Sequence, residues 1–137
     1  MKIFSESRKS YLVLEVAGVE TYFPSLHLSV EVSDEGFAGL NGEVWVDNEN
    51  LKKFVADLQN CERTRNGAAR LVSLSPDDLE LSVEKLDGWG HFVLRYKISK
   101  VSRSPIGLLA TSVGGAFNLD SGLLGQIVSE FADLLPA

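Results

Sequence analysis

Polar and apolar residues alternate along five stretches of the chain. In each stretch every second residue is apolar, which is the period of a strand with one face buried. These stretches are residues 11–17, 26–34, 40–46, 79–84 and 92–98. Alternation of this kind is typical of an antiparallel sheet with one face in water. The segment 102–117, with Pro105 and the pair Gly114-Gly115, predicts one further strand with a glycine-rich end.

Two other stretches repeat apolar residues at helical spacing. The first begins at Asp47 or Asn48, both good N-cap residues, and Glu49 follows in the first turn, where the helix dipole favours an acid. Its apolar stripe consists of Leu51, Phe54, Val55 and Leu58. The second stretch begins within residues 118–121 and ends before Pro136. Its apolar stripe consists of Leu123, Leu124, Ile127, Val128, Phe131, Leu134 and Leu135. Both stripes predict helices that pack on a core.

One segment of the chain recurs. Residues 26–34 read LHLSVEVSD and residues 79–87 read LELSVEKLD, and each is followed by a glycine-containing turn, a second strand and later a helix. The echo predicts two similar β-β-α halves, about 11–60 and 70–135, within a single domain of residues 1–137. Shared strand propensity could produce the same similarity without duplication. We therefore predict an α+β fold: a mostly antiparallel sheet of six to seven strands with two helices packed on one face.

Charge and cysteine content narrow the functional classes. The 137 residues include 13 basic and 19 acidic ones, for a net charge of −6. This balance disfavours a nucleic-acid partner and is compatible with a basic protein partner, although it also serves solubility alone. The single cysteine, Cys61, excludes an intrachain disulfide. The longest apolar run, residues 106–117, is shorter than the roughly 20 residues that span a bilayer. We expect a cytoplasmic protein without membrane association.

The sequence offers little for catalysis. His27 and His91 both fall on the polar side of their strands, and Cys61 follows a helix end, where no helix dipole lowers a thiol pKa. No histidine or cysteine spacing typical of a metal site occurs, and the Gly114-Gly115 segment lacks the lysine of a phosphate-binding loop. We therefore expect no enzyme activity, no metal and no cofactor.

One residue departs from the alternation. Trp45 lies on the nominally polar side of its strand, with Glu43. Exposed tryptophans are frequent interface anchors. The candidate partner-binding residues form an acidic, aromatic patch on the polar face of the sheet: Glu31, Glu43, Trp45, Glu80 and Glu84. The alternative is that a loop or helix covers Trp45. The basic residues of this region are interpreted as solvation and protection of strand edges: Arg63, Arg65, Arg70, Arg95, Lys97, Lys100 and Arg103.

The layout resembles a bacterial family. The residues that carry the resemblance are Asp47-x3-Leu51-x2-Phe54-x3-Leu58, the strand start Gly90-His91, and the closing helix led by Asn118-Leu119-Asp120. This pattern, which covers residues 11–135, is similar to that of the WapI-type immunity proteins and their uncharacterised relatives. Ser121 follows Asp120 where such relatives often carry Gln. The resemblance implies a small cytosolic protein associated with contact-dependent toxin systems, and it implies no catalytic residue.

The functional prediction follows from these points together. We expect a non-enzymatic protein-binding domain, in particular a toxin-neutralising immunity protein that uses an acidic sheet face against a basic toxin domain. The alternative is a small-molecule binder for an apolar ligand, which predicts a cavity of about 300 Å³ or more between sheet and helices.

Overall fold

The chain forms four strands and a helix, and then repeats that order. The computed structural model describes residues 1–75 and 77–135. The elements of the first half are β1 (Lys2–Phe4), β2 (Tyr11–Glu20), β3 (Ser25–Asp34), β4 (Phe37–Asp47) and α1 (Asn48–Thr64). Those of the second half are β5 (Ala68–Val72), β6 (Leu79–Lys85), β7 (Phe92–Ser104), β8 (Gly107–Asn118), a 3₁₀ turn (Ser121–Leu123) and α2 (Leu124–Asp133).

The strands form two separate antiparallel sheets, each in sequential order. Sheet A is β1-β2-β3-β4 and sheet B is β5-β6-β7-β8. The predicted α+β class and antiparallel pairing are confirmed, but the single sheet of six to seven strands is wrong. The chain leaves β4 directly into α1, so sheet B starts anew at β5. The sequence pattern missed β1 and β5, which have three and five residues and are too short to display alternation.

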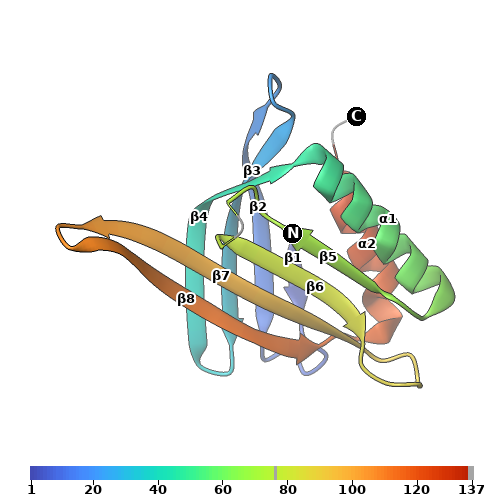
Figure 1. Cartoon of the computed structure of the whole chain (residues 1–137). Helices are drawn as coiled ribbons and strands as arrows, with labels where there is room; N and C mark the ends of the chain where they lie inside the picture. Colours follow the sequence, from blue (N-terminus) through green and yellow to red (C-terminus); the bar gives the residue numbers. More distant parts are fainter. Residues whose placement is uncertain (76, 136–137) are drawn as a thin grey trace.

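The apolar sides of both sheets contribute to one buried cluster with both helices. Sheet B lies across sheet A, and the two helices lie side by side at one side of the pair (Figure 1). The predicted inward residues of β3 are all buried: Leu26, Leu28, Val30 and Val32. Since the two apolar faces bury each other, the two polar faces point away from each other on opposite sides of the molecule.

A β-bulge in β4 changes which residues face the core. Leu28 pairs with Val44, but Val30 pairs with Asn41, so β4 holds one extra residue between the two pairs. The extra residue inverts the alternation before it. Asn41 is buried and donates its Nδ2 to the Ser99 carbonyl at 2.7 Å, whereas Leu40 is 62% exposed. The strict alternation predicted for residues 40–46 is therefore wrong at its first two positions.

The helices follow their sequence signals closely. The Asp47 carboxylate accepts from the Asn50 amide at 2.6 Å, which makes Asp47, one of the two predicted candidates, the N-cap of α1. The α1 stripe is buried and meets α2 where Phe54 packs edge-on against Phe131, with ring centroids 4.9 Å apart. The second helix begins with the 3₁₀ turn and ends at Asp133, before Leu134 and Leu135. The predicted stop at Pro136 lies outside the described residues.

A buried carboxylate links the two sheets. Asp34, at the end of β3, accepts from Ser10 Oγ at 2.7 Å and from Tyr96 Oη of β7 at 2.6 Å. Burial and the bond to Asp34 raise the pKa of Tyr96 far above its usual range, so the phenol remains a donor. Gly115 passes this site so closely that a Cβ there would lie 2.7 Å from Tyr96 Oη.

The repeated sequence segments occupy different places in their sheets. Residues 26–34 lie in β3, the third strand of sheet A, and residues 79–87 begin in β6, the second strand of sheet B. Each half nevertheless has the same order of elements, four strands followed by a helix.

Candidate functional site

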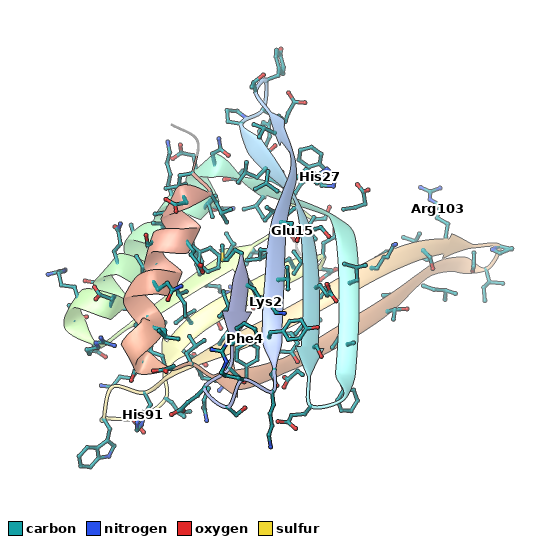
Figure 2. All side chains as sticks on the ribbon, turned by 180° about the vertical axis from the view of Figure 1, so that it is seen from behind. Lys2, Phe4, Glu15, His27, His91 and Arg103 are labelled. Atoms are coloured by element: carbon teal, nitrogen blue, oxygen red, sulfur yellow. The ribbon has the colours of Figure 1, made fainter. Side chains whose placement is uncertain are left out.

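The outer face of sheet A carries three of the five predicted partner-binding residues. Glu31 of β3 and Glu43 of β4 are exposed, and Trp45 of β4 is half-buried. The bulge in β4 leaves all three on this face, which Figure 2 presents toward the viewer, with Glu15 and His27 labelled.

Trp45 is held by its cross-strand neighbour. His27 pairs with Trp45 between β3 and β4, and the two rings stack with centroids 4.7 Å apart and planes 14° from parallel. His27 Nε2 donates to the Gly42 carbonyl at 2.8 Å and lies 3.2 Å from Glu43 Oε2. Gly42 and Glu43, the residues at the bulge, thus hold the His27 ring in place. The result is a rigid, half-buried indole beside an exposed carboxylate.

Next to this pair lie two further acids and an exposed leucine. Glu31 stands opposite Leu40 across β3 and β4, and Glu15 of β2 stands opposite Ser29. Among the described residues, neither Glu15 nor Glu31 has a basic side chain within ion-pair distance. We define the sheet A patch as Glu15, Glu31, Leu40, Glu43 and Trp45. It joins unpaired negative charge with two apolar side chains.

The opposite edge of this face is basic and aromatic. Lys2 Nζ of β1 lies 4.1 Å from the centroid of the Tyr11 ring, and the Arg8 guanidinium lies 4.3 Å from that of Phe4. Figure 2 shows Lys2 and Phe4 at this edge. Cation–π contacts with Tyr11 and Phe4 hold Lys2 and Arg8 at this edge. The face therefore runs from a basic edge at β1 to an acidic edge at β4.

The other two predicted residues lie elsewhere. Glu80 and Glu84 are on β6, on the outer face of sheet B. Glu80 accepts from Arg70 of β5 at 2.8 Å, and Glu84 pairs with Arg95 of β7. The predicted patch is thus split over opposite sides of the molecule, and its sheet B part is neutralised. The interpretation of Arg70 and Arg95 as solvation and edge protection missed these ion pairs, because β5 was not recognised and because the pairing of β6 with β7 was not predicted.

The loop between β6 and β7 presents the second tryptophan. Trp89 is 87% exposed, and its amide donates to Asp87 Oδ1 at 2.8 Å. Asp87 Oδ2 lies 2.8 Å from His91 Nδ1. The hydrogen bond to Asp87 raises the pKa of His91, and the same bond lowers the pKa of Asp87. This ion pair closes the loop beneath an indole that points into solvent.

Three further features bear on possible chemistry: the cysteine, possible metal ligands and apolar helices. Cys61 is buried on α1, and burial raises the pKa of its thiol, which lowers its reactivity. Within residues 1–75 and 77–135, no three His, Cys, Asp or Glu side chains are grouped to hold a metal ion. In the same residues, no helix has the length and apolar character that crossing a bilayer requires.

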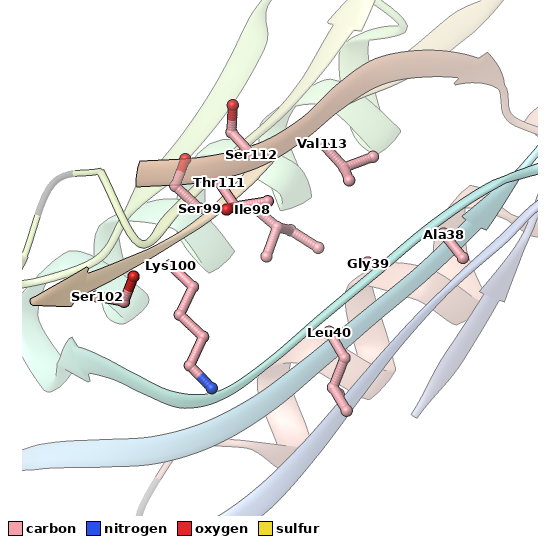
Figure 3. Close-up of a pocket in the computed structure, with 10 residues that line it drawn as sticks. All are labelled: Ala38, Gly39, Leu40, Ile98, Ser99, Lys100, Ser102, Thr111, Ser112 and Val113. Atoms are coloured by element: carbon pink, nitrogen blue, oxygen red, sulfur yellow. The ribbon is translucent and has the colours of Figure 1, made fainter. Parts of the chain in front are cut away.

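The small-molecule alternative predicted a cavity between sheet and helices. Phe54, Phe92 and Phe131 are fully buried in that region, and a hollow bordering both β1 and α2 measures about 220 Å³. A hollow of about 320 Å³ lies instead between β4 and the β7-β8 hairpin (Figure 3). Its lining includes Leu40, Ile98 and Val113.

Comparison of the chain with protein-family models, with characterised proteins and with solved structures gave no match.

Proposed function

We propose that this protein is a non-enzymatic, cytosolic protein-binding domain that recognises a basic partner through the sheet A patch. Glu15, Glu31 and Glu43 supply negative charge, and Leu40 and Trp45 supply apolar contact. The observation that carries the proposal is the lack of basic counterions for Glu15 and Glu31 among the described residues, next to a 62% exposed leucine.

The patch has the features of a recognition surface. Large apolar side chains at the centre of an interface supply most of the binding energy, and Trp is among the commonest of them. Because its histidine neighbour already fixes Trp45, little side-chain entropy is lost when a partner covers it. Unpaired carboxylates around the anchors attract a basic surface and exclude an acidic one.

Toxin neutralisation is the biological role that we propose for this binding. The resemblance of residues 11–135 to WapI-type immunity proteins supports this role, as does the net charge of −6. An acidic protein suits a basic nuclease toxin, because the cationic surface that binds nucleic acid would equally bind the sheet A patch. Occlusion of the toxin surface would require no chemistry from this chain.

Matched charge reversals test the proposal. The chain is used as bait against a basic nuclease toxin domain of a contact-dependent system, with Glu31→Lys/Glu43→Lys as the test variant and Glu80→Lys/Glu84→Lys as the control. We expect the test variant to lose at least about tenfold in affinity, since each close charge contact is worth about 1 kcal/mol or more. The control should change affinity less than about threefold.

Growth of a bacterial host that produces the toxin domain gives the biological readout. Wild type and the sheet B control should rescue growth, and the sheet A variant should not. Equal loss of binding in both variants would refute recognition through sheet A. Binding without rescue would refute the immunity role but not the binding surface.

A further inference from the structure

The β7-β8 hairpin extends well beyond the rest of sheet B. β6 pairs with β7 only from Phe92 to Ile98, whereas β7 and β8 pair with each other as far as Ser104 and Gly107. The outer part, residues 100–111, is a two-stranded arm that projects past β4 (Figure 1). A two-stranded hairpin is marginally stable in water, so a third strand would stabilise this arm.

The outer edge of β8 is open and unprotected. β8 is the last strand of sheet B, and its twelve residues contain no charged residue and no proline. Among the described residues, the backbone bond that reaches β8 from outside its hairpin goes from the Glu6 amide to the Asn118 carbonyl, at 2.8 Å. Gly107–Phe117 therefore present a free edge, which native proteins normally block with charges, bulges or cover.

The other sheet edges are protected. β1 has three residues, and β5 carries the ion-paired Arg70. At the β4 edge, the Trp45 carbonyl accepts from the Leu74 amide at 2.8 Å, and Asn41 is bonded to Ser99. The contrast singles out β8.

We propose that β8 pairs antiparallel with β8 of a second copy of this chain, joining two B sheets into one continuous eight-stranded sheet. A two-fold axis at Ser112, the middle of the free edge, places Leu108 opposite Ala116 and Leu109 opposite Gly115 of the other copy. Leu108 is 68% exposed and Leu109 is 52% exposed. Each large side chain thus meets a small residue, so the edge is complementary to itself.

The hydrogen-bond phase of the hairpin supports the same register. The two-residue connection Pro105-Ile106 makes Ser104 and Gly107 a hydrogen-bonded pair. Counting along the ladder, Ser99 and Ser112 form a non-hydrogen-bonded pair, so the amide and carbonyl of Ser112 point away from β7. They therefore face the second copy, where the two Ser112 residues exchange backbone bonds.

Charge does not oppose a second copy as the occupant. Residues 88–119 contain four basic residues (Arg95, Lys97, Lys100 and Arg103) and no acidic one. The basic strands β7 of two copies would be separated by three strand spacings, about 14 Å. That distance exceeds the screening length of about 8 Å at physiological salt, so the repulsion is weak.

The tip of the arm would meet an acidic site on the other copy. In this register the tip ends beside Phe117 and Asn118, next to a hollow of about 470 Å³. The exposed acids Glu6 and Glu35 line that hollow. Arg103 is carried by the arm near its tip, so opposite charges meet at both ends of the symmetric interface.

Mass measurements on charge-swapped variants test the pairing. Light scattering during gel filtration, over a dilution series, should give twice the chain mass of 15.0 kDa for the wild type at high concentration. Ser112→Lys and Ser112→Asp each place like charges directly opposite each other at the axis and should give 15.0 kDa. An equimolar mixture of the two variants should restore the double mass. Ser102→Lys, an exposed position on β7 of the same arm, is the control and should remain a dimer.

Three results would overturn the proposal. The first is a wild type that stays at 15.0 kDa at every concentration. An edge that binds only a peptide from another protein would give this result. The second is a dimer that survives Ser112→Lys, because its interface must then lie elsewhere. The third is a mixture of the Lys and Asp variants that stays monomeric. Circular dichroism of each variant confirms that loss of the dimer is not loss of the fold.

Discussion

The outer faces of sheets A and B both carry glutamates, but in the described part of the chain those on sheet B are paired with arginines and those on sheet A are not. On sheet B, Glu80 and Glu84 are each bonded to an arginine of a neighbouring strand. On sheet A, Glu15 and Glu31 have no such partner among the described residues, and Glu43 lies beside His27. The negative potential of the protein is therefore concentrated on one side.

The difference arises from strand register rather than from composition. Arg70 pairs with Ser82 across β5 and β6, which leaves its side chain diagonal to Glu80, and Arg95 of β7 also pairs with Ser82. Diagonal neighbours in a sheet lie within reach of long side chains. On sheet A, Val13 and Leu40 lie directly opposite Glu31, and its diagonal neighbours on β2 are Tyr11 and Glu15, so none of these positions supplies a base. An acid count along the chain therefore overstates the acidity of sheet B.

The largest expected effect comes from breaking the bond that holds the two sheets together. Asp34→Ala removes a buried acceptor from both Ser10 and Tyr96, and we expect it to lower the free energy of unfolding by about 3 kcal/mol. Asp34→Asn keeps one acceptor oxygen and should cost about 1 kcal/mol. Urea unfolding at one fixed protein concentration measures both. Equal and small losses would mean that the carboxylate does not link the sheets.

A smaller effect should separate the two outer faces by stability alone. Glu80→Lys/Glu84→Lys breaks two ion pairs and sets like charges diagonally across sheet B, so we expect a loss of about 1 kcal/mol. Glu31→Lys/Glu43→Lys breaks no Lys or Arg pair and should stay within about 0.5 kcal/mol of the wild type. Urea unfolding in low and high salt measures the contrast, and salt should weaken only the sheet B effect. Equal losses for the two variants would contradict the difference between the faces.

The sequence pattern predicted the faces of single strands well and their pairing poorly. Alternation placed Leu28 and Leu81 in the core and Glu31 and Glu84 outside it, because period 2 is a local property of a strand. Which strands pair depends on contacts that are distant in the chain. The counterion of Glu80 could not be predicted, because it sits on a strand of five residues that has no recognisable pattern.

The candidate site shows the same limit at the level of one residue. Trp45 was predicted on the outer face, and it lies there. Leu40 was predicted on the inner face, because the sequence GLNGEVW marks the bulge only weakly. The glycine at position 42 is a weak signal for a bulge, since glycine in a strand often marks one.

Tryptophan fluorescence should sharpen the comparison further. In Trp89→Phe the remaining indole is Trp45, half-buried and stacked on His27. In Trp45→Phe it is Trp89, which is 87% exposed. We expect iodide to quench Trp89 several times more strongly than Trp45, because only the former is freely accessible. Addition of a basic toxin domain, the proposed partner, should protect Trp45 and leave Trp89 unchanged. Protection of Trp89 alone would move the interface away from sheet A.

The smallest effect concerns the ion pair between Asp87 and His91 in the loop after β6. The hydrogen bond to Asp87 raises the pKa of His91 above the ordinary histidine value of 6.5, and the same bond lowers the pKa of Asp87 below the ordinary value of 3.8. Folding therefore favours protonated His91, and that contribution is complete below pH 6.5 and is lost as pH rises through the folded pKa. The Asp87 contribution is present above pH 3.8 and is lost as pH falls through its lowered pKa.

The pair should thus contribute most between these two values, and proton NMR titration of the His91 ring measures the upper limit. Asp87→Asn should return the His91 pKa toward 6.5, because the hydrogen bond to Asp87 is the main cause of its rise. A His91 pKa that does not change in Asp87→Asn would show that Asp87 is not its counterion. The pairing of acids with bases would then be limited to the strands of sheet B.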